Sequence, residues 1–326
     1  MRKCYAVADF LSEENKEQIR KVASDNGFEI EFFDNSYEAS GKVSDGEVLY
    51  SGGDAVTCRE MPALKWCHTA FAGIGAYAAS GLFDSGEILL SNSSGSYSRT
   101  IGEHIIMVSL MMMRKMALYT DAAKEKKWEK EVPLRSIAGS TVVIVGTGDI
   151  GSGAAERFKA LGAEKIVGFN RSGRGADAFD EVYSVSEFDR VFEDKSFSES
   201  VDILVLCAPG TAESKGLLSR ERIGMLSDKT YVVNIGRGVL IDQDALVEAL
   251  NSGKIAGAAL DVMTPEPLPE DDPLWDAKNC IITPHISGNM SLPYTVDKTV
   301  EIFCENLKRY AEGRELINTA NVKRGY

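Results

Sequence analysis

Residues 143–151 read Val-Ile-Val-Gly-Thr-Gly-Asp-Ile-Gly, a GxGxxG turn between an apolar run and a helix-like segment. Between a strand and a helix, this pattern is typical of dinucleotide-binding folds. Gly146 permits the tight turn, Gly148 lets the backbone approach a pyrophosphate, and Gly151 lets the helix pack close to the strand. The helix start offers N–H groups and a positive dipole end to the phosphates. The predicted phosphate-binding residues are Gly146, Gly148, Asp149, Ile150 and Gly151.

Apolar and polar segments alternate on both sides of this turn, as expected for strands and helices. Strands are predicted before it at residues 4–8, 28–33, 48–50, 64–69 and 88–90. Strands are predicted in the second series at residues 141–145, 165–169, 202–207, 230–234, 257–261 and 280–283. Helices are predicted at residues 12–26, 100–119, 149–161, 219–226, 242–251 and 293–313. The small polar residues at 91–99 indicate a hinge. Such alternation predicts an α/β fold with two doubly wound parallel-sheet domains.

Composition and charge exclude several classes of protein. The chain has 326 residues, of which 44% are hydrophobic, and a formal net charge of −13. An acidic surface repels phosphate backbones, which argues against a nucleic-acid partner. The richest apolar run, residues 105–113, is far shorter than the roughly 18 residues that a membrane helix needs. Six scattered cysteines without a CxxC pair fit reduced thiols, so we expect a cytoplasmic protein with neither a membrane partner nor a metal centre.

The loop after the next predicted strand bears on the type of nucleotide. Residues 168–174 read Gly-Phe-Asn-Arg-Ser-Gly-Arg. Sites that use NAD usually place Asp or Glu about 20 residues after the glycine turn, where it binds the ribose 2′-hydroxyl. Asn170 stands there instead, and Arg171 and Arg174 could pair with a 2′-phosphate, helped by the Ser172 hydroxyl. We therefore favour NADP(H) and keep NAD(H) as an alternative. A merely solvated basic loop is the other interpretation.

Three later segments carry polar side chains where predicted strands end. They contain Arg237 in Asn-Ile-Gly-Arg-Gly, Glu266 in Thr-Pro-Glu-Pro and His285 in Thr-Pro-His-Ile-Ser. Ligands of doubly wound sheets bind outside the carboxyl ends of the strands, so these residues could converge on one site. An arginine can bind a carboxylate, and a histidine can exchange protons near neutral pH. The alternatives are a surface ion pair for Arg237, a solvated acid for Glu266 and a structural role for His285.

The chain has only three histidines, so a histidine mechanism has few candidates. His68 lies in the predicted strand at 64–69, where it could belong to the core or line a pocket. His104 lies beside Glu103 in the first turns of the predicted helix at 100–119, where packing or a local hydrogen bond is expected. His285 is therefore the preferred catalytic candidate.

Together with the glycine turn, these segments resemble the D-isomer-specific 2-hydroxyacid dehydrogenase family over most of the chain. Further matching segments are residues 72–75 (Ala-Gly-Ile-Gly), Trp128, residues 208–211 (Ala-Pro-Gly-Thr) and residues 273–275 (Pro-Leu-Trp). The resemblance implies a flavodoxin-like catalytic domain made of residues 1–98 and 290–326. It implies that a Rossmann nucleotide domain, residues 99–289, is inserted into it. It also implies a homodimer.

The resemblance implies hydride transfer between the nicotinamide cofactor and a small 2-oxo acid or D-2-hydroxy acid, such as glyoxylate or hydroxypyruvate on the oxo side. In that reaction His285 would exchange the proton, Glu266 would orient the His285 imidazole and Arg237 would bind the substrate carboxylate. The implied substrate-binding backbone is Ala72, Gly73, Ile74 and Gly75. The remaining implied cofactor contacts are Ala208, Pro209, Thr211, Ile235, Gly236, Arg237, Asp261, His285, Ser287 and Gly288. Many family members carry an aspartate at the position of Gly75, so substrate preference is not carried over.

Two other functions fit the same pattern. The family includes transcriptional corepressors that keep the dehydrogenase fold and sense dinucleotides. The superfamily also includes formate and phosphite dehydrogenases, which would keep the fold and change the substrate. Turnover of 2-oxo acids separates the predicted reductase from both.

Overall fold

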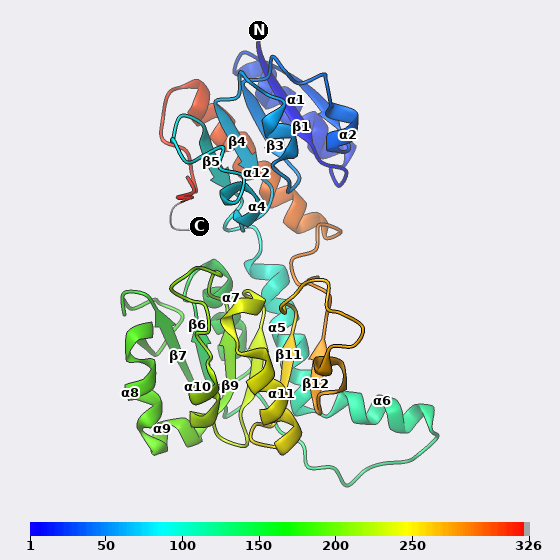
Figure 1. Ribbon diagram of the computed structural model, residues 1–326, viewed down its shortest axis with the longest axis vertical. Helices are drawn as coiled ribbons and strands as arrows, with labels where there is room; N and C mark the ends of the chain where they lie inside the picture. Colours follow the sequence, from blue (N-terminus) through cyan, green and yellow to red (C-terminus); the bar gives the residue numbers. More distant parts are fainter. Residues whose placement is uncertain (323–326) are drawn as a thin grey trace. The chain divides into compact units, whose positions relative to one another are not determined.

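The computed structural model describes residues 1–322. The chain divides into two compact units, one made of Met1–Tyr97 with the chain from Asn289 onward, the other of Ser98–Gly288. Each unit contains a parallel sheet with helices against it (Figure 1). The predicted α/β class with two parallel sheets is confirmed. No helix within residues 1–322 is long and apolar enough to cross a membrane.

The first unit contains a five-stranded parallel sheet in the order β2-β1-β3-β4-β5, the flavodoxin-like order. Its strands are β1 Arg2–Val7, β2 Phe28–Phe33, β3 Val48–Ser51, β4 Trp66–Thr69 and β5 Leu89–Asn92. Its helices are α1 Glu13–Asp25, α2 Ser36–Ala39, α3 Val56–Arg59, α4 Gly75–Ala78 and α12 Pro293–Ala311.

Helix α12 comes from the far end of the sequence and completes the core of the first unit. Its buried face includes Val300 and Phe303, which belong to the same apolar cluster as Tyr50 and Trp66. The Phe303 ring stacks on Trp66 with centroids 5.5 Å apart, and the Tyr50 hydroxyl lies 2.8 Å from that of Thr299. Figure 1 shows the orange α12 among the blue and cyan elements of this unit. The sheet and the C-terminal helix therefore form one hydrophobic core.

The second unit contains a seven-stranded parallel sheet in the order β12-β11-β10-β9-β6-β7-β8. Its strands are β6 Thr141–Val145, β7 Lys165–Asn170, β8 Glu181–Ser184, β9 Val201–Leu206, β10 Tyr231–Asn234, β11 Gly257–Leu260 and β12 Cys280–Ile282. Its α-helices are α5 Ser98–Met113, α6 Met116–Lys124, α7 Asp149–Ala160, α8 Phe188–Glu193, α9 Lys195–Ser200, α10 Arg220–Met225 and α11 Gln243–Ser252. Short 3-10 turns are η1 Val185–Glu187, η2 Gly238–Leu240 and η3 Pro273–Asp276. The strand order reverses between β6 and β9, which creates a ligand crevice at their carboxyl ends in folds of this type.

The glycine turn connects β6 to α7 as the sequence predicts. Gly146 has φ +102°, and a Cβ there would lie 2.9 Å from the carbonyl carbon of Cys207. A Cβ on Gly151 would lie 1.8 Å from the Gly146 carbonyl oxygen, and this clash could not be relieved without moving the backbone. Gly148 differs, because no atom lies within 4 Å of its Cβ position. Two glycines are thus needed for packing, and Gly148 leaves space above the start of α7.

Several elements differ from the sequence predictions. The predicted helix at 100–119 is two helices, because Lys115 takes a left-handed conformation with φ +56° between α5 and α6. Strand β8 and helices α8 and α9 were not predicted. The predicted hinge at 91–99 overlaps the end of β5 at Asn92 and the start of α5 at Ser98, and the boundary between the two units falls within it, between Tyr97 and Ser98. Ser91 is buried, where it accepts a hydrogen bond from the Trp66 indole.

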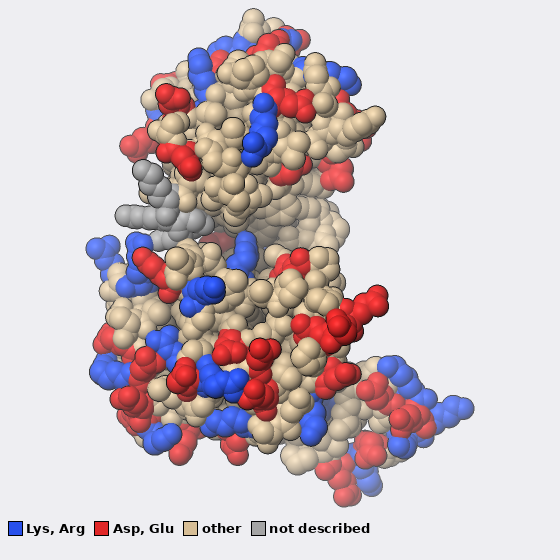
Figure 2. All heavy atoms as spheres, in the orientation of Figure 1, with Lys and Arg blue, Asp and Glu red and all other residues tan. Residues whose placement is uncertain are grey.

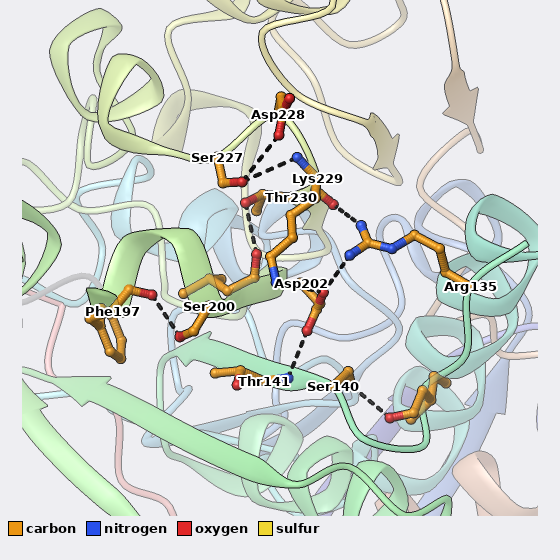
Figure 3. A network of polar contacts seen from close by, with 12 residues as sticks. Arg135, Ser140, Thr141, Phe197, Ser200, Asp202, Ser227, Asp228, Lys229 and Thr230 are labelled. Atoms are coloured by element: carbon orange, nitrogen blue, oxygen red, sulfur yellow. Dashed lines mark hydrogen bonds and ion pairs between the residues drawn. The ribbon is translucent and has the colours of Figure 1, made fainter. Parts of the chain in front are cut away.

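A polar network anchors the segment after α6 to the amino end of the second sheet (Figure 3). Arg135 pairs with Asp202 at 2.7 Å and also donates to the Lys229 carbonyl. Asp202 accepts the Thr141 backbone N–H at 3.0 Å, where β6 begins. The chain at 125–134 is thereby held at both ends, by α6 and by Arg135.

Candidate active site

Glu266 and His285 meet on loops that follow β11 and β12. The His285 Nδ1 lies 2.7 Å from Glu266 Oε2, and the other carboxylate oxygen accepts the Met263 backbone N–H at 3.0 Å. A carboxylate only accepts, so the neutral imidazole carries its proton on Nδ1 and leaves a lone pair on Nε2. The His285 side chain is 48% exposed, and no described hydrogen bond uses Nε2. The pair therefore presents one ring nitrogen to an incoming ligand.

The backbone of His285 is held by a buried carboxylate, that of Asp261. The Asp261 carbonyl accepts the His285 N–H at 2.8 Å, and its carboxylate accepts the N–H groups of Ile286 and Ser287, both at 2.9 Å. The Thr283 hydroxyl donates to the same carboxylate at 2.6 Å. His285 itself has φ +55°, a conformation that non-glycine residues rarely take. Asp261 thus fixes an unusual loop that aims the imidazole.

His104, on α5, is a further neighbour of Thr283 and Asp261. Its Nε2 is 3.4 Å from the Thr283 hydroxyl and 4.0 Å from Asp261 Oδ1. Of the two predicted roles, packing agrees with this largely enclosed imidazole, whereas its described polar neighbours, Thr283 and Asp261, are distant in the sequence rather than local. Burial lowers the pKa of His104 despite the attraction of Asp261. Burial alone would raise the pKa of Asp261, but its hydrogen bonds with Ser287 and Thr283 hold it below the ordinary value.

His68, by contrast, is part of the core of the first unit. Its Nδ1 lies 2.7 Å from the Ser91 hydroxyl, and its Nε2 lies 3.0 Å from the Ser93 hydroxyl. Burial lowers the pKa of His68 to about 3, so the imidazole is neutral at physiological pH. Both ring nitrogens are occupied, which leaves none for a ligand.

Arg237 lies in the loop that follows β10, and β10 is the neighbour of β11 in the sheet. The Asn234 amide shapes this loop by donating to the Arg237 carbonyl at 3.0 Å and accepting the Gly236 N–H at 3.1 Å. A Cβ on Gly238 would lie 2.0 Å from the Met263 carbonyl oxygen, so the loop packs directly on the segment that leads to Glu266. The exposed guanidinium donates to the Gly236 carbonyl at 2.6 Å. No described contact joins it to the Glu266–His285 pair.

The predicted cofactor loops lie at the carboxyl ends of the central strands. Residues 208–211 follow β9, where the Ser214 hydroxyl donates to the Pro209 carbonyl and accepts the Thr211 N–H. A Cβ on Gly236 would lie 2.6 Å from the Ala208 carbonyl oxygen, so this loop contacts the one after β10. Ile235 is buried next to it, and Ser287 and Gly288 end the second unit. The first turn of α7 leaves N–H groups without helical partners, as every helix start does.

Asn170 is the centre of the loop after β7. Its Oδ1 accepts the N–H groups of Ser172 at 3.0 Å and Gly173 at 2.7 Å. Its Nδ2 donates to the Thr147 hydroxyl and to the Arg174 carbonyl, each at 2.9 Å. Sequence reasoning compared Asn170 only with the acid of NAD sites and missed this local role. The side chains of Arg171 and Arg174 are exposed on the loop.

Residues 72–75 belong to the first unit, unlike every other candidate residue. The Phe71 carbonyl accepts the Ser93 N–H at 3.2 Å, and the Ala72 carbonyl accepts the Asn92 amide at 2.9 Å. Gly75 begins α4. With the carbonyls engaged, the N–H groups of Gly73 and Ile74 have no partner among the described hydrogen bonds, which suits them to an anion.

A doubly wound sheet with a GxGxxG turn and a histidine–carboxylate pair at its carboxyl edge defines a class, the nicotinamide-dinucleotide-dependent oxidoreductases. Comparison with known families places the protein within that class. The sequence profile of the D-isomer specific 2-hydroxyacid dehydrogenase NAD-binding domain matches residues 106–287. The chain belongs to this family.

Individual relatives agree with the family assignment. The chain is 33% identical to a hydroxypyruvate reductase of Blautia hydrogenotrophica over 68% of each chain. It is 31% identical to glyoxylate/hydroxypyruvate reductase B of Pectobacterium atrosepticum over 74% of this chain and 75% of that one. A crystal structure of a family protein from Aeromonas salmonicida superposes with a TM-score of 0.83 at 28% identity, covering 98% of this chain and 99% of that one. The protein is therefore an oxidoreductase of the 2-hydroxyacid dehydrogenase family that uses a nicotinamide dinucleotide and acts on 2-oxo acids.

Proposed function

We propose that the protein reduces a small 2-oxo acid, such as glyoxylate or hydroxypyruvate, to the D-2-hydroxy acid with NADPH. The observation that carries the proposal is the 2.7 Å contact between His285 Nδ1 and Glu266 Oε2, which leaves Nε2 exposed. Similar relatives are named hydroxypyruvate reductase and glyoxylate/hydroxypyruvate reductase, which supports this substrate class.

His285 supplies the proton in the proposed reaction. When bound, the nicotinamide dinucleotide supplies the hydride that reduces the carbonyl carbon. The protonated His285 donates from Nε2 to the carbonyl oxygen, and in the reverse direction it takes that proton back. Glu266 accepts the Nδ1–H throughout, which keeps the ring oriented and stabilises its charged form. The pair therefore has the arrangement that general acid–base catalysis needs.

Arg237 holds the substrate carboxylate in the same proposal. Its guanidinium has a fork geometry that matches a carboxylate and attracts negative charge on the carbonyl oxygen. The internal bond to the Gly236 carbonyl uses Nη1 only, so other donors remain for an anion. The N–H groups of Gly73 and Ile74 are proposed as the second carboxylate contact.

The second unit is proposed as the dinucleotide-binding domain and the first as the catalytic domain. The residues fit a bound dinucleotide because the Gly148 position is open and leads to the first turn of α7. Arg171 and Arg174, with no acid among residues 168–174, support NADPH over NADH, because a carboxylate there would repel the 2′-phosphate.

We propose small molecules as the substrates and a cytoplasmic location. The six cysteines are free thiols, which suits a reducing compartment. On the face drawn in Figure 2, basic and acidic side chains are interspersed over both units, an arrangement unlike a nucleic-acid-binding surface.

Initial rates test the proposed function directly. Oxidation of NADPH and of NADH is followed in parallel with glyoxylate, hydroxypyruvate, pyruvate, 2-oxobutyrate and phenylpyruvate. We expect turnover with a small 2-oxo acid and a higher kcat/KM for NADPH. Higher kcat/KM with NADH would keep the reductase and reject the cofactor preference. Oxidation of formate or phosphite without 2-oxo acid reduction would reject the substrate class.

We also propose a homodimer that buries an apolar surface of the second unit. The exposed large apolar side chains on α5, α6 and the segment after them are Met107, Met116, Leu118, Trp128 and Leu134. Trp128 is 92% exposed on a segment that Arg135 holds in place, which is unusual unless a partner covers it. Light scattering should give twice the mass of the chain, and the double variant Leu118→Glu/Trp128→Ala should shift it toward the monomer. A monomeric wild type at micromolar concentration would contradict the proposal.

A further inference from the structure

The Asn170 side chain can be oriented without ambiguity. Its Oδ1 faces the N–H groups of Ser172 and Gly173, which can only donate. Its Nδ2 faces the carbonyl of Arg174, which can only accept. Rotating the amide by 180° would oppose all three of these partners. Both ends of the amide are therefore used, and each has a fixed chemical identity.

The same nitrogen connects two parts of the candidate cofactor site. Through its second proton, Nδ2 reaches the hydroxyl of Thr147, which is the x of the first Gly-x-Gly in the phosphate turn. Thr147 in turn lies against Gly168, where a Cβ would be 2.7 Å from its methyl group. Asn170 thus joins the phosphate turn to the loop that carries Arg171 and Arg174.

A carboxylate at position 170 could not replace this amide. It would still accept the two N–H groups on one oxygen. Its other oxygen, however, would face the Arg174 carbonyl oxygen at the place where the amide nitrogen now donates at 2.9 Å. Two acceptors at hydrogen-bond distance repel, and the lost bond leaves that carbonyl unsatisfied. The loop would have to open to relieve the contact.

We infer that Asn170 is a specificity-determining residue that acts by building the loop, so that a simple exchange to aspartate does not create an NADH site. The inference rests on the proposed preference for NADPH and explains how the arginines are held. It departs from the general rule that an acid at this position binds the ribose 2′-hydroxyl. In this chain an aspartate at position 170 would break the hydrogen bond to the Arg174 carbonyl and so disrupt the loop proposed to position the ribose.

The test compares Asn170→Asp with Thr147→Val, using the full-length protein. The dissociation constants of NADPH and NADH are measured by titration, and amide hydrogen exchange over residues 170–174 is measured without nucleotide. For Asn170→Asp we expect weaker NADPH binding by tenfold or more, no gain in NADH affinity and faster exchange at Ser172 and Gly173; tenfold equals about 1.4 kcal/mol. Thr147→Val keeps the charge and size but removes one acceptor, and should weaken NADPH binding by about two- to tenfold.

Two further variants separate the possible failures. Asn251→Asp adds the same charge near Lys278, at the opposite end of the sheet, and controls for net charge. Arg171→Asp tests the proposed function itself, because it should penalise NADPH more than NADH. If Arg171→Asp leaves the ratio of the two affinities unchanged, the cofactor assignment is wrong whatever Asn170 does. If Arg171→Asp removes the preference but Asn170→Asp gains NADH affinity with unchanged exchange, only the loop-building role is overturned. Should Asn170→Asp fail to fold, unchanged NADPH affinity in Thr147→Val would overturn the inference.

Discussion

His285→Ala should lower kcat for 2-oxo acid reduction by about 10²- to 10⁴-fold, the usual contribution of a positioned general acid. Within the described residues, the variant removes the exposed imidazole of the second unit, whose side chain is 48% accessible compared with 9% for His104. His104 should not take over, because its side chain is only 9% exposed and its Nε2 faces Thr283 and Asp261. Affinity for the dinucleotide should change little, since the phosphate turn and its helix are untouched. Single-turnover kinetics and nucleotide titration together measure both quantities.

Glu266→Gln provides the matched comparison for the histidine. The glutamine has a single acceptor oxygen, so it can accept from either the Met263 N–H or His285 Nδ1 but not from both, and it carries no charge to stabilise the imidazolium. Its kcat should therefore fall, but less than that of His285→Ala, because the imidazole itself is still present. A His285→Ala variant with near wild-type kcat would remove the proposed proton donor.

Arg237→Ala should lower kcat/KM by a factor of roughly 30 to several thousand, which corresponds to a loss of about 2–5 kcal/mol in transition-state stabilisation. The estimate applies to removing one partner of a desolvated ion pair, as expected when a substrate carboxylate meets the guanidinium. The loop itself should survive, because Asn234 bonds to the backbone of residues 236 and 237 and not to the arginine side chain. Steady-state kinetics at several 2-oxo acid concentrations would show the loss.

Two variants sharpen the test of Arg237. Arg237→Lys keeps the charge but loses the bidentate fork, so it should recover only part of kcat/KM. Arg220→Ala removes an exposed arginine of the same unit, paired with Glu248, and should leave the kinetics unchanged. Full activity in Arg237→Ala would mean that the carboxylate clamp lies elsewhere.

The parts of the fold that follow from local rules could be predicted from the sequence. The apolar run before Gly146 and the glycine spacing identify β6, the turn and α7. Buried parallel strands such as β9 read as continuous apolar stretches, so their positions were also predictable. The positions of Glu266 and His285 after strands indicated where they lie, although only the structure shows their direct contact.

Other features depend on tertiary structure that no local pattern encodes. Strand β8 is a half-buried edge strand of four residues with little apolar signal. The break at Lys115 needs a left-handed lysine, a conformation that sequence preference disfavours. The sequence around His104 predicts packing or a local hydrogen bond, because its neighbour Thr283 is 179 residues away in the chain. Sequence comparison sets Asn170 against the acid of NAD-using enzymes, whereas its bonds to Thr147 and Arg174 appear only when the loop is folded.

The contribution of α12 to the first core sets an order for assembly during synthesis. Tyr50 and Trp66 pack against Phe303, which the ribosome adds more than two hundred residues after them. At about 5–20 residues per second, the sheet of the first unit waits roughly 10–40 seconds for that helix. The second unit, continuous from Ser98 to Gly288, has all its strands before α12 exists. The first unit is therefore the last to be completed, and the face of its sheet that α12 covers has no such cover until then.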